Sequence, residues 1–571
     1  MMKGNSKHLL SILLFLHFFL VQDILCAKHI VRTESELCSL LSEDKDHGVI
    51  LLDGDLFHVA DINVKAGGII KPYPGRKPTI IGFHQKVSRN ERPIDQNGYW
   101  SIPIKSYGYS QIVFLDEKFE PIPYSSKING QDGFDIKEKQ IKVINEAERL
   151  VGVPIPIGFD YLKNRDKLFF KNFSVKMSYW FVGISLRKIY SDANYLYGVI
   201  DNAYNYNLLS IRPYAKVQLE FFNLPKKGDG VFLDGNDMLH VPSRYNTVYV
   251  CSSPPLLKLK GNNNITFENL SFTGANYDAI HIEGSNKHFN KCTFRNCGAG
   301  IITIGNSYSD CSVTNCLFEN FYDNRVISFS GINDAVIANN TIRHTGTLMK
   351  GGSVISVAGL NFKANDNKVS DYSYIAISVG NTRDYRPGTI TGLVSNNIID
   401  NIANYGYADN QLTDGGGIYV ITHTDGVVIE KNIVRNIGYE GGELWGIYLD
   451  DGAYNCTVRR NLVYNMWPGQ YALTARYVDD CERSCMNNIF ENNILIGPCK
   501  IAGNRKGFGR KTIIRNNYIS GELNTQGDEY VSLEGNKLVS AIVREDGRII
   551  FGKGNRIKKR GFTRRIKNLI K

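Results

Sequence analysis

Carboxyl and aromatic side chains concentrate in two short segments of this 571-residue chain. Residues 413–419 read TDGGGIY, and residues 445–451 read WGIYLDD. Cleavage of a glycosidic bond needs two carboxyl groups, one acting as the acid and the other as base or nucleophile, so these segments could perform that reaction. The candidate acids within or beside them are Asp414, Glu443, Asp450 and Asp451.

A short repeat from Ile265 onward indicates which elements position these acids. Its anchor is usually an Asn followed two positions later by an apolar residue, and successive anchors are 19 to 35 residues apart. Short strands rich in Val, Ile and Phe with such variable spacing are typical of a parallel β-solenoid whose extra residues loop out from one edge. Asn side chains stacked on successive coils can pair amide to amide. The anchors are Asn269, Lys291, Asn315, Asn340, Asn367, Asn397, Asn432, Asn461, Asn493, Asn517 and Asn536.

Each coil also contains a strand in which the first and third residues are apolar and face the core, so that the middle residue faces solvent. Most of the middle residues are small, but two consecutive coils present Tyr419 and Tyr448, which are expected about 4.8 Å apart. We therefore predict an all-β chain folded as a right-handed parallel β-helix. The strands are Ile280-His281-Ile282, Ile302-Thr303-Ile304, Ile327-Ser328-Phe329, Ile355-Ser356-Val357, Ile377-Ser378-Val379, Ile418-Tyr419-Val420, Ile447-Tyr448-Leu449 and Leu473-Thr474-Ala475.

Strand parity suggests different roles for the candidate acids. Asp450, two residues beyond Tyr448, is expected on the outward face, with Arg476 at the equivalent position of the next coil. A carboxylate beside a guanidinium stays ionised, so Asp450 is the predicted nucleophile or base, and Asp414 or Glu443 is the predicted acid. Structural roles remain open, because an Asp before three glycines is typical of a turn, and Asp450 with Arg476 of a surface ion pair.

The residues around the acids predict a surface for a saccharide substrate. Aromatic faces can stack on sugar rings, and the glycines at 415–417 would let a substrate approach the backbone. Cys481 and Cys485 lack a second pair with zinc-ligand spacing, so we predict no metal site and no cofactor. A histidine such as His423 is more often a polar surface residue than a catalytic one. The predicted binding residues are Tyr419, Tyr448, Trp445, Arg476 and His423.

The chain divides into five predicted parts. Residues 1–27 read as a secretory signal, because Lys3 and Lys7 precede an apolar run and residues 25–27 offer a cleavage site. The mature protein is therefore expected in the periplasm, at the cell surface or outside the cell. Residues 28–89 and 251–550 predict β-helix coils, residues 90–250 an inserted β-rich, sandwich-like domain, and residues 551–571 a basic tail.

The net charge of +11 is concentrated at the C-terminal end. Nine Lys and Arg residues, with no acid among them, lie in residues 551–571. We interpret them as a solvated tail, and we expect a polysaccharide or oligosaccharide partner and no nucleic acid. Membrane contact is expected only through this tail or through lipidation of Cys26, for which the preceding Leu25 is unfavourably large.

The two active-face segments resemble those of β-helix glycoside hydrolases in the pectate-lyase-like superfamily, especially family 141 and, more distantly, the β-xylosidases of family 120. The shared features are Asp414 before the Gly-Gly-Ile-Tyr strand at 416–419 and the Gly-Ile-Tyr-Leu-Asp-Asp segment at 446–451. Those families are also similar in having an early inserted β-sandwich, whose closing strands residues 219–222 and 228–233 resemble. The resemblance implies hydrolysis of plant or host glycans, with Asp414 and either Asp450 or Asp451 as the catalytic pair.

Two other functions fit the same residues. A polysaccharide lyase acting on a uronic-acid polymer uses a Lys or Arg base, and Arg476 beside Asp450 permits that reading. A non-catalytic surface solenoid that binds glycans would need the aromatic residues and not the acids.

Overall fold

The computed structural model describes residues 29–557, apart from isolated positions and the segments 105–113, 123–132, 138–141, 158–161, 168–172, 180–181, 202–213, 222–229, 234–237, 252–253, 381–389, 404–413, 422–423, 440–441, 477–484, 504–511, 527–530, 539–541, 545–548 and 551–555. The predicted signal at 1–27, including Cys26, lies outside the described residues, as does His423. Of the predicted basic tail, the described part is strand β57 (Arg556–Ile557).

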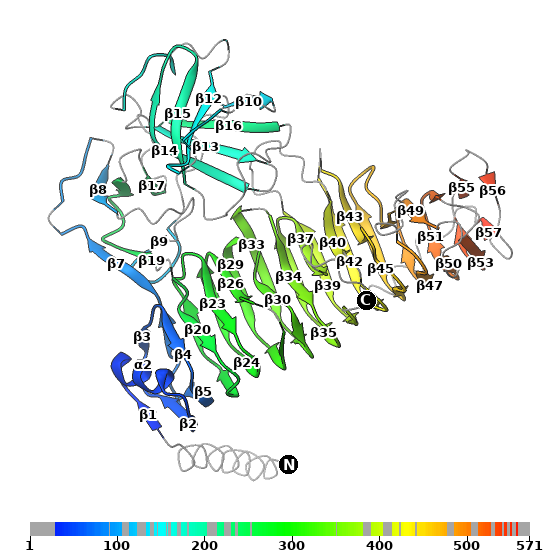
Figure 1. The fold of residues 1–571 in the computed structure, drawn as a ribbon, viewed down its shortest axis with the longest axis horizontal. Coiled ribbons are helices and arrows are strands. Elements are labelled where there is room, and N and C mark those ends of the chain that lie inside the picture. The colour runs from blue at the N-terminus through cyan, green and yellow to red at the C-terminus, as the bar shows by residue number, and fades with distance from the viewer. Residues whose placement is uncertain are drawn as a thin grey trace, which may run out of the picture.

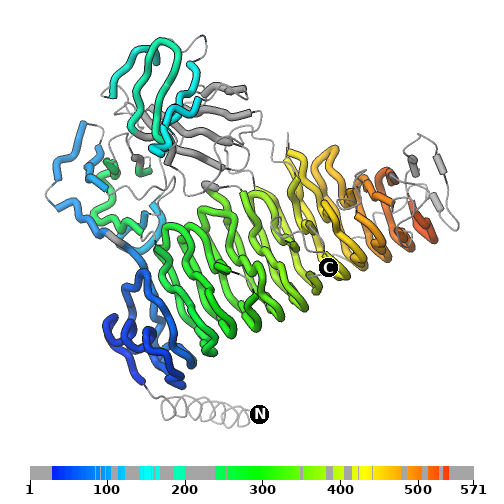
Figure 2. The backbone as a smooth tube through the Cα atoms, in the orientation of Figure 1, coloured from blue at the N-terminus to red at the C-terminus, as the bar shows by residue number. Residues whose placement is uncertain are grey.

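The described residues form three sheets of fourteen strands each, wound into a solenoid whose coils follow one another from the N-terminal to the C-terminal end (Figures 1 and 2). One sheet runs from β1 (His29–Val31) to β53 (Val531–Glu534), and another from β3 (Leu56–His58) to β57. Neighbouring strands are parallel, except for the last pair of the remaining sheet, β55 with β56. The predicted all-β parallel solenoid is therefore confirmed.

That remaining sheet carries the candidate acids and tyrosines and is called the site sheet below. Its strands, in spatial order, are β4 (Ile62–Val64), β20 (Leu257–Lys260), β23 (Asp278–Glu283), β26 (Ala299–Thr303), β30 (Ile327–Ser330), β34 (Ser353–Ala358), β37 (Ile375–Val379), β40 (Gly415–Val420), β43 (Leu444–Leu449), β46 (Leu473–Ala475), β49 (Cys499–Ala502), β52 (Leu523–Gln526), β55 (Ile542–Arg544) and β56 (Ile549–Ile550).

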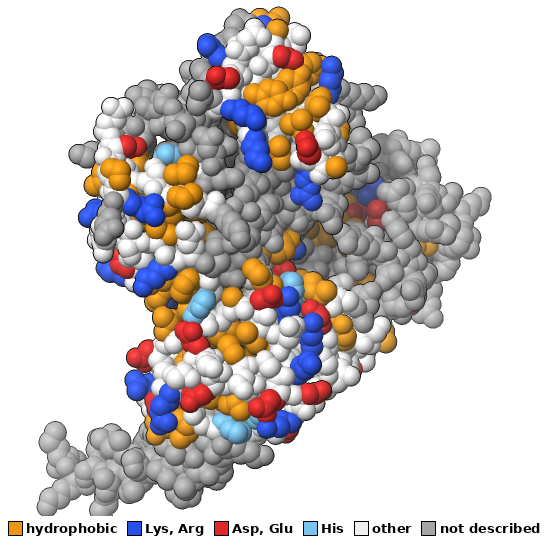
Figure 3. Space-filling view, turned by 60° about the vertical axis from the view of Figure 1, so that its left-hand side comes forward, with side chains coloured by type: hydrophobic (Ala, Val, Ile, Leu, Met, Phe, Trp, Pro, Cys, Tyr) orange, Lys and Arg blue, Asp and Glu red, His pale blue; other side chains and the backbone are white. Residues whose placement is uncertain are grey.

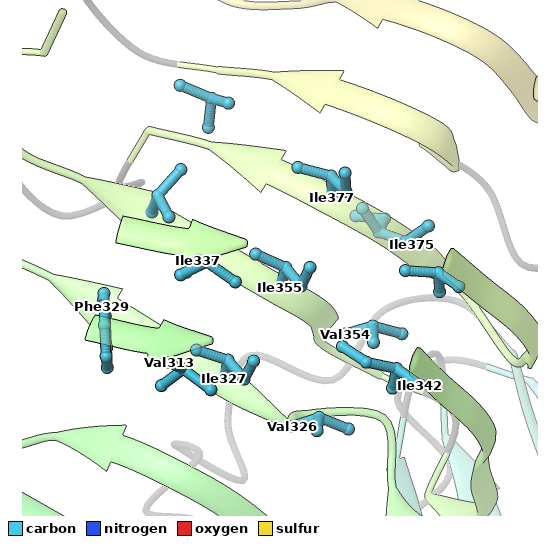
Figure 4. Close-up of a cluster of buried hydrophobic side chains, with 14 of the residues drawn as sticks. Val313, Val326, Ile327, Phe329, Ile337, Ile342, Val354, Ile355, Ile375 and Ile377 are labelled. Atoms are coloured by element: carbon cyan, nitrogen blue, oxygen red, sulfur yellow. The ribbon is translucent and has the colours of Figure 1, made fainter. Parts of the chain in front are cut away.

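A column of aliphatic side chains forms the inner face of the site sheet. Figure 4 shows Ile327, Ile355 and Ile377 stacked on successive coils, and the column continues through Ile418 and Ile447. All five are fully buried. Since large aliphatic groups withdrawn from water contribute roughly 1.5 to 3 kcal/mol each, this repeated column is a main source of solenoid stability.

The predicted register was wrong by one residue in β26. Ile280 pairs with Ile301 and not with Ile302, so Ile302 joins the outward column and Ile304 is 44% exposed. Residues 301–304 read Ile-Ile-Thr-Ile, and such a nearly continuous apolar run fits either parity. The other predicted strands of the column pair as expected.

A ladder of buried asparagines runs along one corner of the solenoid. In each step the side-chain Nδ2 and the backbone N–H of one Asn donate to Oδ1 of the next, at 2.9 to 3.1 Å. The predicted amide pairing between coils is thus confirmed for eight anchors. They are Asn340, Asn367, Asn397, Asn432, Asn461, Asn493, Asn517 and Asn536.

The first three anchors, Asn269, Lys291 and Asn315, were placed one residue too early. They adopt positive φ values of 54 to 57°, and the ladder column at their coils holds Leu270, Cys292 and Cys316. Positive φ suits Asn, so the turn beside the ladder attracts the same residue type as the ladder itself. Asn339 before Asn340 is an example. Because the turn column and the ladder column are adjacent and both favour Asn, the sequence alone does not show which Asn of a coil belongs to the ladder.

Removing one rung of this ladder is expected to destabilise the fold. Asn432→Ala would leave the two donors of Asn397 and the carbonyl of Val394 without these bonds, and the Oδ1 of Asn461 would keep only the bond from the backbone N–H of residue 432. Because buried polar groups lose their partners, we expect the free energy of unfolding to fall by about 2–4 kcal/mol in chemical denaturation. Asn264→Ala, at an exposed position, is the matched control and should change it little. Equal denaturation midpoints for the two variants would contradict a stabilising ladder.

A lysine lies inside the solenoid wall. Lys287, the first residue of β24 (Lys287–Asn290), is 1% exposed, and its Nζ donates to the carbonyl of Asn263 at 2.6 Å. Burial lowers the pKa of Lys287 to about 8, from an ordinary value of 10.5. Because the folded pKa lies below the unfolded one, the charge destabilises the fold fully below pH 8, and the penalty disappears as the pH approaches 10.5.

Lys287→Met is therefore expected to raise the free energy of unfolding by about 3 kcal/mol at neutral pH, with the gain shrinking above pH 8. Denaturant titrations of wild type and variant between pH 6 and pH 10 would measure it. Lys363→Met, at an exposed position, should show no such pH dependence. A constant difference between the Lys287 variant and wild type across this range would argue against a buried charge.

The N-terminal end of the solenoid is covered by a short helix, α2 (Glu34–Ser42). Thr33 caps the helix, accepting from the backbone of Glu36, whose own side chain accepts from the Thr33 backbone. Leu37 and Leu41 of this helix join the solenoid core. The helix thereby shields apolar side chains that would otherwise be exposed at the end of the stack.

An antiparallel insert interrupts the coils between β6 (Thr79–Ile81) and β20, and Figure 1 shows it standing above the first half of the solenoid. Two three-stranded sheets share one apolar core, in which Trp100 and Val250 lie, and so form a small sandwich. The strands of these sheets are β7 (Phe83–Ser88), β8 (Tyr99–Pro103), β9 (Phe114–Leu115), β17 (Phe232–Leu233), β18 (Met238–Pro242) and β19 (Thr247–Cys251). The first of these strands, β7, begins before the predicted bound at residue 90, and the predicted division into domains stays a prediction.

A larger sheet completes the described part of the insert. Its strand β14 contacts β33 (Thr341–Met349) of the solenoid. Figure 3 shows hydrophobic side chains gathered on the outer part of the insert, while charges of both signs are interspersed over the first coils. The strands of this sheet are β10 (Gly133–Lys137), β11 (Lys142–Asn145), β12 (Leu150–Pro154), β13 (Phe173–Tyr179), β14 (Val182–Ser191), β15 (Tyr195–Asp201) and β16 (Tyr214–Phe221).

The nine described cysteines form no disulfide among themselves, and all except Cys38 are buried. Among the helices of the described residues, none has the length and apolar character needed to cross a bilayer.

Candidate active site

Two tyrosines face outward from neighbouring strands of the site sheet. Tyr419 in β40 pairs with Tyr448 in β43, as predicted, with ring centroids 5.2 Å apart and planes inclined by 61°. Trp445 packs its ring 4.2 Å from that of Tyr448. The two tyrosines are only 8% and 4% exposed, so neighbouring groups cover most of the predicted aromatic floor.

Asp450 lies directly after β43 and is 3% exposed. The Tyr419 hydroxyl donates to its Oδ2 at 2.7 Å, and Nη1 of Arg476 donates to its Oδ1 at 3.0 Å. The predicted Asp450–Arg476 neighbourhood is therefore present, but the carboxylate is buried and does not form a surface ion pair. A carboxylate so far from water needs this counter-charge and these hydrogen bonds to remain in place.

Burial and neighbouring charges raise the pKa values of both tyrosines. Burial raises the pKa of Tyr419 far above its usual range, and the charge and hydrogen bond of Asp450 raise it further. Burial is also the largest cause of the raised pKa of Tyr448. The charge and hydrogen bond of Asp450 raise this pKa further, and the charge of Asp414 has a smaller effect in the same direction. Both phenols therefore stay protonated at neutral pH.

Asp414 enters β40 through a strained turn. Its φ is +59°, a left-handed conformation that Asp tolerates better than most residues, and its backbone carbonyl accepts a hydrogen bond from the Tyr374 hydroxyl at 2.9 Å. The side chain is half-buried. The turn interpretation of Asp414 is therefore correct for its backbone, and the residue directly precedes the strand that carries Tyr419.

The glycines after Asp414 serve close backbone packing. A Cβ on Gly416 would lie 1.8 Å from the Trp445 carbonyl oxygen, and one on Gly417 would lie 2.5 Å from Val434 and 2.6 Å from the Gly446 carbonyl. All three residues at 415–417 are buried. The expectation that they open the backbone to a substrate was wrong, because the adjacent coil fills that space.

The other predicted acids differ in their surroundings. Asp451 is partly exposed, and its Oδ1 lies 3.2 Å from Nη1 of Arg476, so that one guanidinium serves two carboxylates. Glu443 is exposed, and the pairing of Gly415 with Leu444 places it one coil from Asp414. Asp450 is thus the candidate acid that is most withdrawn from solvent.

Sequence reasoning overlooked Tyr374 and Thr474. Tyr374 occupies the position equivalent to Gly415 in the preceding coil, and Thr474 pairs with Tyr448 in the following one. The column alignment that located Tyr419 contained Thr474, whereas Tyr374 lies three residues before the aligned strand Ile377-Ser378-Val379. Among the described residues, no group of three His, Cys, Asp or Glu side chains is placed to hold a metal ion.

A family model described as the right handed beta helix region matches residues 229–389. The predicted right-handed parallel β-helix is thereby confirmed. No match was found among curated proteins.

Several solved structures resemble the chain weakly. One, described as a glycoside hydrolase, has 11% identity and a TM-score of 0.47, covering 89% of both chains. A complex of XylC with xylose has 9% identity and a TM-score of 0.36, covering 92% of this chain and 85% of its own. The A-module of the Azotobacter vinelandii mannuronan C-5 epimerase AlgE6 has 11% identity and a TM-score of 0.30, covering 55% and 80%.

Proposed function

We propose that this protein is a carbohydrate-active enzyme, a glycoside hydrolase whose site is built around Asp450 and Asp414. The observation that carries the proposal is the Asp450 carboxylate, which is almost wholly removed from solvent yet bound through both oxygens by Tyr419 and Arg476. A half-buried second acid, Asp414, lies directly before β40, the strand that carries Tyr419. Two carboxyl groups in unlike surroundings are what glycosidic hydrolysis requires.

The surroundings of the two acids divide the roles between them. Arg476 supplies a positive charge to Asp450, which suits a carboxylate acting as nucleophile or base. Asp414 has the more solvent-accessible position and is proposed as the proton donor to the leaving sugar. Trp445, partly exposed beside Tyr448, offers an aromatic face for a sugar ring. This assignment agrees with the resemblance to family 141, which remains a prediction.

The alternative of a lyase with Arg476 as its base is not favoured. Burial lowers the pKa of Arg476, but the hydrogen bond and charge of Asp450 and the charge of Asp451 outweigh it, so the pKa is raised overall. A general base must be able to give up its proton at the working pH. Arg476 would remain a cation, suited to holding carboxylates in position.

The test is an assay of the mature protein on a panel of neutral and acidic polysaccharides and oligosaccharides. We expect new reducing ends without the ultraviolet absorbance of unsaturated sugars. Unsaturated products would instead indicate a lyase. Glycan binding without cleavage of any panel member would support the non-catalytic interpretation.

A further inference from the structure

The outward column that contains the two tyrosines continues past them toward the C-terminal end. Tyr448 pairs with Thr474 in β46, Thr474 with Lys500 in β49, and Lys500 with Asn524 in β52. Each of these residues lies between two core-facing neighbours, so its side chain points outward. At about 4.8 Å per coil, Lys500 is roughly 10 Å from Tyr448.

Two polar atoms in this column are shielded from solvent but lack a protein partner. Thr474 is 7% exposed, and its Oγ1 has no hydrogen-bond partner among the described residues. The Oδ1 of Asn524 is also buried and also has no hydrogen-bond partner among the described residues. Buried hydroxyl and amide groups are nearly always hydrogen-bonded in folded proteins, so two open positions in one column point to a ligand that supplies the partners.

Lys500 stands between these two residues. It is partly exposed and forms no ion pair within the described part of the chain, unlike Arg476, whose guanidinium is engaged by Asp450 and Asp451. No other residue along the outward column from Ser328 to Asn524 carries a charge. An uncompensated ammonium flanked by hydroxyl and amide groups suits an anionic group with several acceptor oxygens.

We propose that Thr474, Lys500 and Asn524 form a subsite, called the Lys500 subsite, for an anionic substituent on the substrate. This substituent is the carboxylate of a uronic acid or a sulfate ester, carried by a sugar outside the cleavage position. The inference rests on the proposed hydrolase function and narrows its substrate to an acidic glycan. The Lys500 ammonium binds the charge, and Thr474 and Asn524 bind hydroxyls or oxygens beside it.

Binding can be measured by calorimetry in an Asp450→Asn background, so that the probe is not consumed. The probes are an oligogalacturonide, its carboxyl-reduced form, a sulfated galactan oligosaccharide and its desulfated form. We expect one charged probe to bind more tightly than its neutral counterpart, and the bound probe identifies carboxylate or sulfate as the ligand. Adding Lys500→Gln should weaken that binding by about 10-fold or more and leave the neutral probes unchanged.

The matched control is Lys368→Gln, an exposed lysine on another sheet, which should change nothing. Thr474→Val should weaken binding of the same charged probe while retaining the side-chain shape. If neither charged probe binds better than its neutral form, or if Lys500→Gln binds all probes as its parent does, the subsite is overturned. If the wild type cleaves a glycan but Lys500→Gln does not change probe binding, only the subsite is contradicted. If Lys500→Gln weakens binding of the charged probe but no glycan is cleaved, only the hydrolase function is contradicted.

Discussion

Asp450→Asn is expected to reduce kcat/KM on a cleaved glycan by about 10³-fold or more, because the amide has no nucleophilic or basic oxygen at this position. The substitution keeps the side-chain shape, but the NH2 group of the new Asn cannot accept a hydrogen bond from either Tyr419 or Arg476. Reducing-end assays on the glycan panel would measure the loss. Circular dichroism and gel filtration would show whether the variant remains folded.

Asp451→Asn is the matched control for this experiment. Asp451 lies 3.2 Å from the same Nη1 of Arg476 that binds Asp450, but its side chain is more exposed. Its replacement should reduce kcat/KM by no more than about 10-fold, as expected for the loss of one polar contact. If Asp451→Asn abolished turnover and Asp450→Asn did not, the nucleophile or base would be Asp451.

Gly416→Ala is expected to destabilise the protein by more than about 4 kcal/mol and to disturb the site. The new Cβ would lie 1.8 Å from the Trp445 carbonyl oxygen, and the φ of +146° is strained for any side chain. Because the Cβ would clash with the Trp445 backbone, a rotamer change cannot relieve the contact. Separation of β40 from β43 would displace Tyr419 from Tyr448 and remove the Asp450 hydrogen bond. Thermal unfolding and turnover of the same preparation would measure both effects.

Gly426→Ala separates the two causes. Gly426 also has a positive φ, +83°, but a Cβ there would meet nothing within 4 Å. Its replacement should cost about 1 kcal/mol from backbone strain alone. If the two variants unfolded at the same temperature, packing of the adjacent coil would not be the reason for glycine at position 416.

The sequence alone established the solenoid because its repeats report local requirements that every coil shares. A buried Asn pairs with an Asn one coil away, and an isoleucine stacks on an isoleucine, so one column repeats the same residue type many times. The register failed where two neighbouring columns accept the same residue, as at Asn315, or where apolar residues are continuous, as at Ile302. In both places the residue types fit the local structure equally well after the alignment is shifted by one residue.

The candidate site could be located from sequence, but its acids could not be ranked. Asp414, Glu443, Asp450 and Asp451 are all near the two tyrosines in the alignment, and side-chain burial is not a local property of any of them. The partners of Asp450 are supplied by residues 31 and 26 positions away in the chain. The use of glycine at position 416 likewise depends on the backbone of the next coil. Thus repetition of one coil determined the fold and the face of the site, while the contacts between coils decided which carboxylate is withdrawn from water.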